Sequence, residues 1–207
     1  MKLAIVTDFD GTITTRDVGD FLLLNFGLAT QKEIDESYLP GIKIEEWMRK
    51  YFSRIKIVNI DEIKKVIKEN IKIRDGFKEV IIKFQSMNMP FEVVSGGVDL
   101  YIEEVFKINS IKLSGYYGRF NDGNIEYDFL NEKITLSDFK AMRVKYYKNK
   151  GYKTIFCGDA ANDYKAAKTA DITFAELRLR EMLEREYYKF HPLDDFKRVM
   201  EIVCFPI

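Results

Sequence analysis

The chain has 207 residues, of which 46% are hydrophobic and 32% charged, so it can form one substantial core, with or without a small accessory domain. Lysine plus arginine and aspartate plus glutamate each number 33, and this zero net charge excludes a whole-chain field that would attract nucleic acid. The N-terminus lacks the apolar segment of a signal peptide, and no run approaches the roughly 18 apolar residues of a membrane span, so we expect no membrane partner.

The two cysteines, Cys157 and Cys204, lack the spacing of a metal or redox motif. We expect buried free thiols, which indicate a reducing, cytoplasmic compartment. Gln31 and Gln85 are the only glutamines in a chain rich in lysine, glutamate and isoleucine. This composition resembles that of thermophile proteins.

The first predicted strand, Leu3 to Val6, is followed by the segment Thr7-Asp8-Phe9-Asp10-Gly11-Thr12. Side chains two positions apart in an extended segment point the same way, so Asp8 and Asp10 converge unless the chain bends. Two ionised carboxylates this close repel each other and raise one pKa, unless a cation or a proton joins them. An Asp-Gly hairpin is the alternative interpretation, but the helix-like run Arg16 to Leu24 argues against it.

A helical region without a good strand comes next. Its candidate helices are Asp17 to Phe26, Gln31 to Tyr38, Ile44 to Ile55 and Ile60 to Asn70, with Pro40-Gly41 separating the second from the third. We interpret residues 14–74 as a helical cap inserted into an α/β core that consists of residues 1–13 and 75–207.

The rest of the chain alternates strands and helices. Helix Phe77 to Met87 stops before Pro90. Predicted strands follow at Phe91 to Val94, Thr154 to Cys157 and Ile172 to Phe174, each with a polar turn and a helix-like segment after it. This rhythm predicts an α/β fold with a doubly wound parallel sheet.

Residues 112–130 interrupt this rhythm. Tyr116 to Phe120 and Ile125 to Phe129 alternate across Asn121 to Asn124, which predicts a small β-hairpin. The remaining predicted helices are Ser137 to Lys148, Ala160 to Lys168, Glu176 to Tyr188 and Asp194 to Val203.

Ligands bind outside the carboxyl ends of the strands in such a sheet. Ser95-Gly96-Gly97 follows the second strand, and we interpret it as a helix entrance whose free N–H groups favour an anion. A plain helix N-cap is the alternative for Ser95. Asp159 and Asp163 follow the third strand and can share a face if a helix starts there. The alternative interpretation is that both are only acids in the first turn of a helix, stabilised by the helix dipole.

Four carboxylates in one cleft, from Asp8, Asp10, Asp159 and Asp163, would repel one another strongly without a cation. Oxygen ligands without histidine or cysteine favour Mg²⁺ over Zn²⁺. Mg²⁺ held by few carboxylates completes its shell with water and a phosphate oxygen, so a phosphate ester fits the site. Lys140 is the candidate positive side chain, although an ordinary solvated lysine is the default at any one position.

Taken together, Asp8-Phe9-Asp10-Gly11-Thr12, Ser95-Gly96, a later lysine and Gly158-Asp159-x-x-Asn162-Asp163 resemble the four motifs of the haloacid dehalogenase superfamily. The resemblance covers the whole chain. It implies that Asp8 attacks phosphorus to form an aspartyl-phosphate, while Asp10 protonates the leaving oxygen and later activates water.

The same resemblance implies a ligand set. Mg²⁺ would be held by Asp8, by the backbone carbonyl of Asp10 and by Asp159, with Asp163 binding directly or through water. Ser95, Gly96 and Lys140 would bind the transferring phosphoryl group. Lys133 and Lys145 lie close enough in sequence to compete with Lys140 for this assignment.

Two branches of the superfamily compete. The cap and the hairpin resemble the phosphoserine phosphatase-like branch, whereas the C-terminal stretch around Phe174-Ala175 and Tyr188-Lys189-Phe190 is more similar to the hydroxyketo-methylthiopentenyl phosphate phosphatase branch. The Cys/His-rich stretch frequent in the latter is absent from Asn131 to Phe139, which weakens the transfer of its substrate.

Substrate contacts are expected from the cap. By resemblance to phosphoserine phosphatases, Asp17 would contact a substrate cation and Arg49 a carboxylate, although two solvated helix charges are an equally good interpretation. We therefore expect a Mg²⁺-dependent phosphomonoesterase, monomeric or homodimeric, that acts on a small phosphate ester. A phosphotransferase or phosphomutase of the same superfamily and a phosphoacceptor switch module are the alternatives.

Overall fold

The structure is a computed structural model that describes residues 2–39 and 41–204, with side chains to residue 202. In this part of the chain, a seven-stranded sheet forms the centre of the protein. The strand order is β4-β3-β2-β1-β5-β6-β7. All neighbouring strands run parallel except β3 and β4, which form an antiparallel hairpin. The strands are β1 (Leu3–Thr7), β2 (Phe91–Val98), β3 (Gly115–Asn121), β4 (Asn124–Glu126), β5 (Lys153–Gly158), β6 (Ile172–Ala175) and β7 (His191–Pro192).

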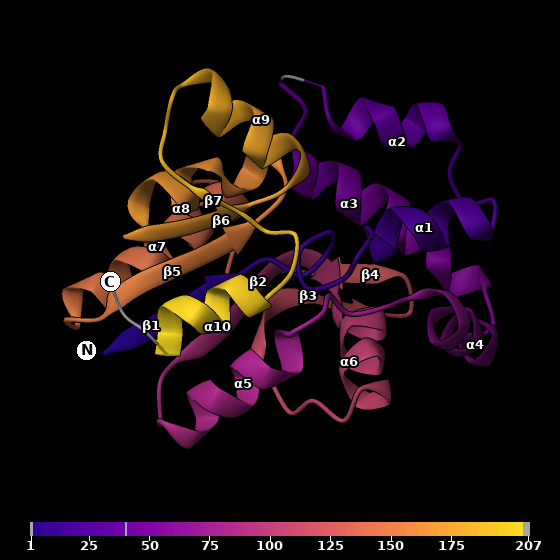
Figure 1. Cartoon of the computed structure of the whole chain (residues 1–207). Helices are drawn as coiled ribbons and strands as arrows, with labels where there is room; N and C mark the ends of the chain where they lie inside the picture. Colours follow the sequence, from indigo (N-terminus) through magenta and orange to yellow (C-terminus); the bar gives the residue numbers. More distant parts are fainter. Residues whose placement is uncertain (1, 40, 205–207) are drawn as a thin grey trace.

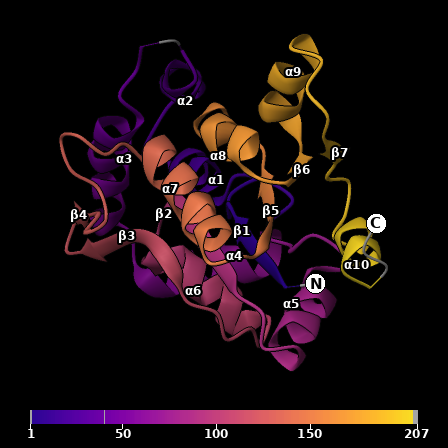
Figure 2. The same ribbon diagram turned by 90° about the vertical axis from the view of Figure 1, so that its left-hand side faces the viewer.

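Helices cover both faces of the sheet, as Figure 2 shows. On one face lie α5 (Phe77–Ser86), α6 (Asp99–Ile108) and α10 (Lys197–Cys204), and on the other lie α7 (Leu136–Asn149) and α8 (Tyr164–Thr169). Because both faces are covered, every residue of β1 is buried, as expected of a central parallel strand. The predicted fold class, an α/β protein with a doubly wound sheet, is confirmed.

Four helices between β1 and α5 lie beyond the carboxyl ends of the strands (Figure 1). They are α1 (Val18–Asn25), α2 (Gln31–Ser37), α3 (Ile44–Phe52) and α4 (Ile60–Asn70), with a 3₁₀ turn at Ser53–Ile57. Side chains cap the starts of α1, α2 and α4, as in the capping box of Thr30 with Glu33. Trp47 and Tyr51 stack with ring centroids 4.4 Å apart, so these aromatic residues pack inside the helical region. The division into a cap and a core stays a prediction.

Ser95 is not at a helix entrance, so that interpretation is wrong, and so is the N-cap alternative. Strand β2 continues past Val94 with a shift in register to Val98, and α6 begins only at Asp99. Glycines at positions 96 and 97 allow this irregular extension because neither carries a side chain into the crowded space beside it.

Smaller differences have local causes. Strand β4 ends at Glu126, before the predicted end at Phe129, and the two-residue strand β7 was not predicted. Helix α8 begins at Tyr164, because the Asp163 side chain accepts hydrogen bonds from the N–H groups of residues 159 and 160 and holds a 3₁₀ turn there. Asp10-Gly11 forms no hairpin, since the chain turns back on Phe9 and enters α1.

Cys157 is a buried free thiol, as expected. The Cys204 side chain and Pro40 lie outside the described residues. Among the helices that the structure describes, none combines the length and the apolar character needed to cross a membrane.

Candidate active site

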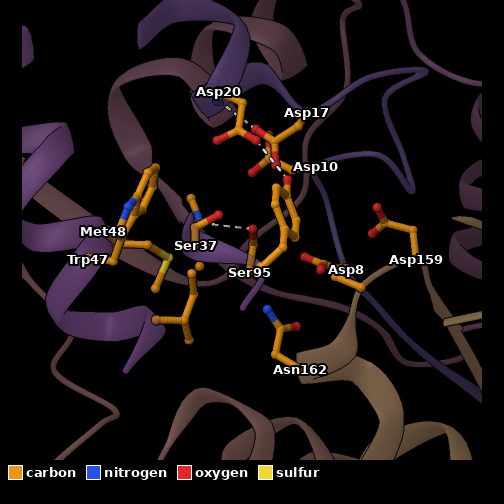
Figure 3. Close-up of a pocket in the computed structure, with 15 residues that line it drawn as sticks. Asp8, Asp10, Asp17, Asp20, Ser37, Trp47, Met48, Ser95, Asp159 and Asn162 are labelled. Atoms are coloured by element: carbon orange, nitrogen blue, oxygen red, sulfur yellow. Dashed lines mark hydrogen bonds between the residues drawn. The ribbon is translucent and has the colours of Figure 1, made fainter. Parts of the chain in front are cut away.

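A cavity of about 80 Å³ lies between the carboxyl ends of the strands and the helices α1–α3. In Figure 3, Asp10, Asp17 and Asp20 gather on one side, Trp47 and Met48 on another, and Asp8, Asp159 and Asn162 on a third. The lining residues are Asp8, Asp10, Asp17, Asp20, Ser37, Tyr38, Ile44, Trp47, Met48, Ser95, Gly96, Gly97, Asp159, Ala160 and Asn162. Among these described lining residues, none is a lysine or an arginine.

Asp8 and Asp10 leave the end of β1 with separate partners. The chain bends after Thr7, and Asp8 Oδ1 accepts a 2.6 Å hydrogen bond from the Phe9 N–H, while Oδ2 faces Lys140. Asp10 instead accepts from the Val18 N–H at 2.9 Å and from the Tyr101 hydroxyl at 2.8 Å. The bend therefore prevents the convergence expected for a straight strand and gives the two acids different environments.

Lys140 is fully buried in the second turn of α7. Its Nζ lies 2.7 Å from Asp8 Oδ2, 2.6 Å from Asp163 Oδ1 and 2.8 Å from Asn162 Oδ1, so all three ammonium protons are donated. Lys133 and Lys145, the competing lysines, are exposed. Of the three lysines, only Lys140 reaches the carboxylates at the strand ends.

Asp8, Asp159 and Asp163 form a candidate metal site. Each offers one carboxylate oxygen, and these oxygens all lie within 4.8 Å of one another. Thr12 fixes Asp159 by donating to Oδ1 at 3.0 Å. Three carboxylates with one lysine leave two uncompensated negative charges, and the oxygen-only donor set suits a hard divalent cation such as Mg²⁺.

Burial dominates the electrostatics of this cluster. It raises the pKa of Asp8 to about 7, despite the opposing charge of Lys140, and it raises the pKa of Asp159 well above its ordinary value together with the charges of Asp8 and Asp163. Burial alone would lower the pKa of Lys140, but the neighbouring carboxylates outweigh it and raise that pKa. The lysine is therefore charged, and the acids favour a proton or a cation.

Burial also raises the pKa of Asp10 to about 6, against the lowering effect of the Tyr101 hydrogen bond. A carboxyl group whose pKa lies close to neutral pH can exchange a proton with a reacting group efficiently. Asp10 is thus suited to proton transfer, whereas Asp8 is held among charges.

The predicted phosphate-binding segment, Ser95-Gly96, also lines the cavity. Ser95 is buried, and its Oγ accepts from the Gly97 N–H at 3.0 Å. The Gly96 carbonyl accepts a 2.6 Å hydrogen bond from the Tyr127 hydroxyl. A Cβ at position 96 would lie 2.5 Å from Met48 Sδ, so a larger residue there would displace Met48 from the cavity wall. Ser95, Gly96 and the acids are therefore brought together around one space.

The two predicted substrate residues differ in their placement. Asp17 caps α1 through a 2.7 Å hydrogen bond from the Asp20 N–H and lines the cavity. Burial, followed by the charges of Asp20 and Asp10, raises its pKa well above the ordinary value. Arg49 is not among the lining residues; its exposed side chain lies over the Tyr127 ring, 5.3 Å from the ring centroid.

Sequence reasoning missed several residues that hold the site. Thr12 stands inside the first motif, so its position could have indicated a role. Tyr101 and Tyr127 carry no local signal, because each meets its partner only through the fold. His191, the only histidine of the sequence, lies on β7 and is not among the residues that line the cavity.

An acidic cavity at the carboxyl ends of a doubly wound sheet, with a buried lysine between carboxylates, is an arrangement suited to hydrolysis at an anionic centre. The model of the haloacid dehalogenase-like hydrolase family matches residues 5–168, more than half of the chain. The protein belongs to this family, and the predicted resemblance is confirmed.

Curated relatives cover nearly the full chain. A 2-hydroxy-3-keto-5-methylthiopentenyl-1-phosphate phosphatase of Microcystis aeruginosa is 29% identical and covers 97% of each chain. A protein of the same name from Lysinibacillus sphaericus is 27% identical over 98% of this chain and 94% of its own. The expected enzyme class, a phosphatase, agrees with these names.

Solved structures show the same fold. A substrate-bound phosphoserine phosphatase complex superposes with a TM-score of 0.73 at 23% identity and covers 97% of each chain. A phospho-aspartyl intermediate analogue of phosphoserine phosphatase gives a TM-score of 0.71 at 23% identity, covering 99% of this chain and 98% of the other.

Proposed function

We propose that this hydrolase is a Mg²⁺-dependent phosphomonoesterase that acts through an aspartyl-phosphate on Asp8. The observation that carries the proposal is the cluster of Asp8, Asp159 and Asp163, whose oxygens lie within 4.8 Å of one another, with Lys140 Nζ 2.7 Å from Asp8. An acid at a strand end, held by a fixed cation and beside a candidate metal site, suits nucleophilic attack on a phosphate.

The reaction has two steps. An oxygen of Asp8 attacks phosphorus, the bond to the leaving oxygen breaks, and Asp10 gives its proton to that oxygen. Asp10 then takes a proton from the water that attacks the aspartyl-phosphate, which releases phosphate and restores Asp8. The separate partners of the two carboxylates support this division of roles.

The other residues of the site would stabilise the negative charge of the phosphoryl group. Mg²⁺, when bound by Asp8, Asp159, Asp163 and the Asp10 carbonyl, would neutralise phosphate charge. Lys140 holds Asp8 in place and offers a positive charge within the buried carboxylate cluster. Ser95 and the amides beside Gly96 would donate hydrogen bonds to the phosphoryl oxygens.

The cavity walls support a leaving group that joins polar groups to an apolar part and has no carboxylate. Asp17 and Asp20 offer no positive partner to a carboxylate, and they can accept hydrogen bonds from hydroxyl groups or a cation. Trp47 and Met48 offer apolar surface. The hydroxy, keto and methylthio groups named in the relatives' substrate combine these properties, so we propose an ester of this kind ahead of phosphoserine.

Substrate choice is tested with a panel of phosphate esters that includes 2-hydroxy-3-keto-5-methylthiopentenyl-1-phosphate and phosphoserine. We expect a higher kcat/KM for the former, and no effect of Arg49→Ala on it. A preference for phosphoserine that is lost in Arg49→Ala would instead support the carboxylate contact predicted from the sequence.

The activity itself is tested with p-nitrophenyl phosphate, with and without Mg²⁺. Steady turnover by the wild type, lost in Asp8→Asn and kept in the matched exposed variant Asp61→Asn, supports a hydrolase. A single turnover would indicate a phosphoacceptor switch, and turnover that requires an added alcohol or sugar would indicate a phosphotransferase. A cytoplasmic location and a monomeric or homodimeric state stay predictions.

A further inference from the structure

Both oxygens of the Asp10 carboxyl group are held by donors from elements far apart in the sequence. Oδ1 accepts from the Val18 N–H at the start of α1 at 2.9 Å, and Oδ2 accepts from the Tyr101 hydroxyl in the first turn of α6 at 2.8 Å. A rotation about the Cβ–Cγ bond would break both hydrogen bonds. The plane of the carboxyl group is therefore fixed.

The Tyr101 hydroxyl occupies a space that two glycines leave open. A Cβ at Gly97 would lie 2.3 Å from this hydroxyl oxygen and 2.7 Å from Asp10 Oδ2. A Cβ at Gly19 would lie 3.1 Å from the same hydroxyl. Side chains at either position would push the hydroxyl away from Asp10.

The ring of Tyr101 is fixed as firmly as its hydroxyl. The side chain is fully buried, and its ring packs against Phe9 on one side and against Phe52 of α3 on another, with both centroids 6.2 Å away. Phe9 lies between the two catalytic acids in sequence, and Phe52 belongs to the helices that cover the cavity. The hydroxyl is thus positioned by the core and by these helices together.

We propose that Tyr101 is a positioning residue that orients the Asp10 carboxyl group for proton transfer to the leaving oxygen. Proton transfer to a leaving group depends on such alignment, and a displacement of about 1 Å in an active site can reduce the rate about 100-fold. Tyr101 is not among the residues that line the cavity, and its side-chain hydrogen bond to the site is the one that it donates to Asp10. The inference rests on the proposed function, in which Asp10 is the proton donor.

Tyr101→Phe tests this proposal, because it removes one hydroxyl and keeps the buried ring. The measured quantity is kcat/KM for p-nitrophenyl phosphate, phenyl phosphate and an alkyl phosphate. The leaving oxygen becomes more basic in this order, so its departure depends increasingly on a proton from Asp10. This ratio reports the first step, in which Asp10 donates. Tyr147→Phe is the matched control, since Tyr147 also donates to a carboxylate, that of Glu92 at 2.9 Å, outside the cavity.

We expect Tyr101→Phe to lower kcat/KM on the order of tenfold for the alkyl ester, a part of the 10²- to 10⁴-fold that general acid catalysis contributes. The loss for p-nitrophenyl phosphate should be much smaller, and Tyr147→Phe should lower neither. Melting temperatures close to that of the wild type would show that both variants are folded.

An equal loss for all three esters, or no loss for any, would overturn the positioning role while leaving the phosphatase proposal intact. A wild-type protein that hydrolyses none of the esters would overturn the proposed function, and this inference with it. The two failures are therefore distinguishable.

Discussion

Replacing Lys140 with methionine removes a charge that the folded protein encloses completely. The side chain is 0% exposed, and its Nζ donates to Asp8, Asp163 and Asn162 at 2.6–2.8 Å. Methionine has nearly the same length and fills the same space, so the change isolates the loss of the cation. Asp8 and Asp163 are then left buried without it.

The expected effect is large because removing one partner of a buried ion pair destabilises a protein by about 3–5 kcal/mol. In a chain of this size about 1 kcal/mol shifts Tm by 2–4 °C, so Tm should fall by roughly 6–20 °C at pH 8. The fall should be smaller at pH 5, since Asp8, whose pKa burial already raises to about 7, then holds a proton in place of the lysine charge.

Thermal melts of the metal-free Lys140→Met protein at both pH values measure this effect, and Lys145→Met is the control. Lys145 lies on the same helix α7 but is exposed, so we expect its loss to change Tm little. Mg²⁺ should restore part of the stability of Lys140→Met at pH 8, while phosphatase activity stays absent. Equal losses at pH 5 and pH 8, or a loss no larger than that of the control, would refute the reasoning.

Three further outcomes follow from the same geometry. Folding raises the pKa of Asp8 from 3.8 to about 7, so between these pH values the folded state holds a proton that the unfolded state has released. The Tm of the metal-free protein should therefore fall as pH rises from 4 to 7, and Asp8→Asn should flatten this profile. A Tm that rises over this range would contradict the prediction. Gly11→Ala should abolish the stabilisation by Mg²⁺, because its Cβ would lie 2.2 Å from Asp159 Oδ2. Gly27 has a similar positive φ but open space around it, so Gly27→Ala should lower the free energy of unfolding by only about 1–2 kcal/mol and keep the Mg²⁺ response. Equal effects in the two variants would argue against this steric account. Arg74→Met should raise the Mg²⁺ concentration needed for half-maximal activity, since Arg74 donates to two carbonyls of the loop after β1 at 2.7 and 2.9 Å; an unchanged requirement would show that the loop holds its shape without them.

Elements with strong periodicity and clear end signals could be predicted from the sequence. Helix α4 runs from Ile60 to Asn70 as expected, because its apolar face is regular and Asn59 caps its start. Strand β2 could not be predicted to its end, because Gly96 and Gly97 read locally as a break. Their actual role is to leave room for Met48 beside Gly96, and for the Tyr101 hydroxyl and Asp10 beside Gly97, and Met48 and Asp10 are distant in sequence.

The same limit applies to the site. The acids and Lys140 could be assigned to the site from two local signals. These signals are the spacing of the motifs and the position of the acids just after predicted strands, where ligands bind in a parallel sheet. The Tyr101 hydroxyl meets Asp10 across 91 positions, and no local pattern indicates that contact. Arg49 could not be placed from the sequence either, because its position over the Tyr127 ring depends on a contact that only the fold creates.

Identifying the residue that carries the phosphoryl group tests the central claim most directly. The wild type is mixed with p-nitrophenyl phosphate and Mg²⁺, quenched in acid within the first turnover, digested and analysed by mass spectrometry. We predict a phosphoryl group on the peptide that contains Asp8, with none in Asp8→Asn. A phosphoryl group on a different residue, or undiminished turnover by Asp8→Asn, would contradict the account.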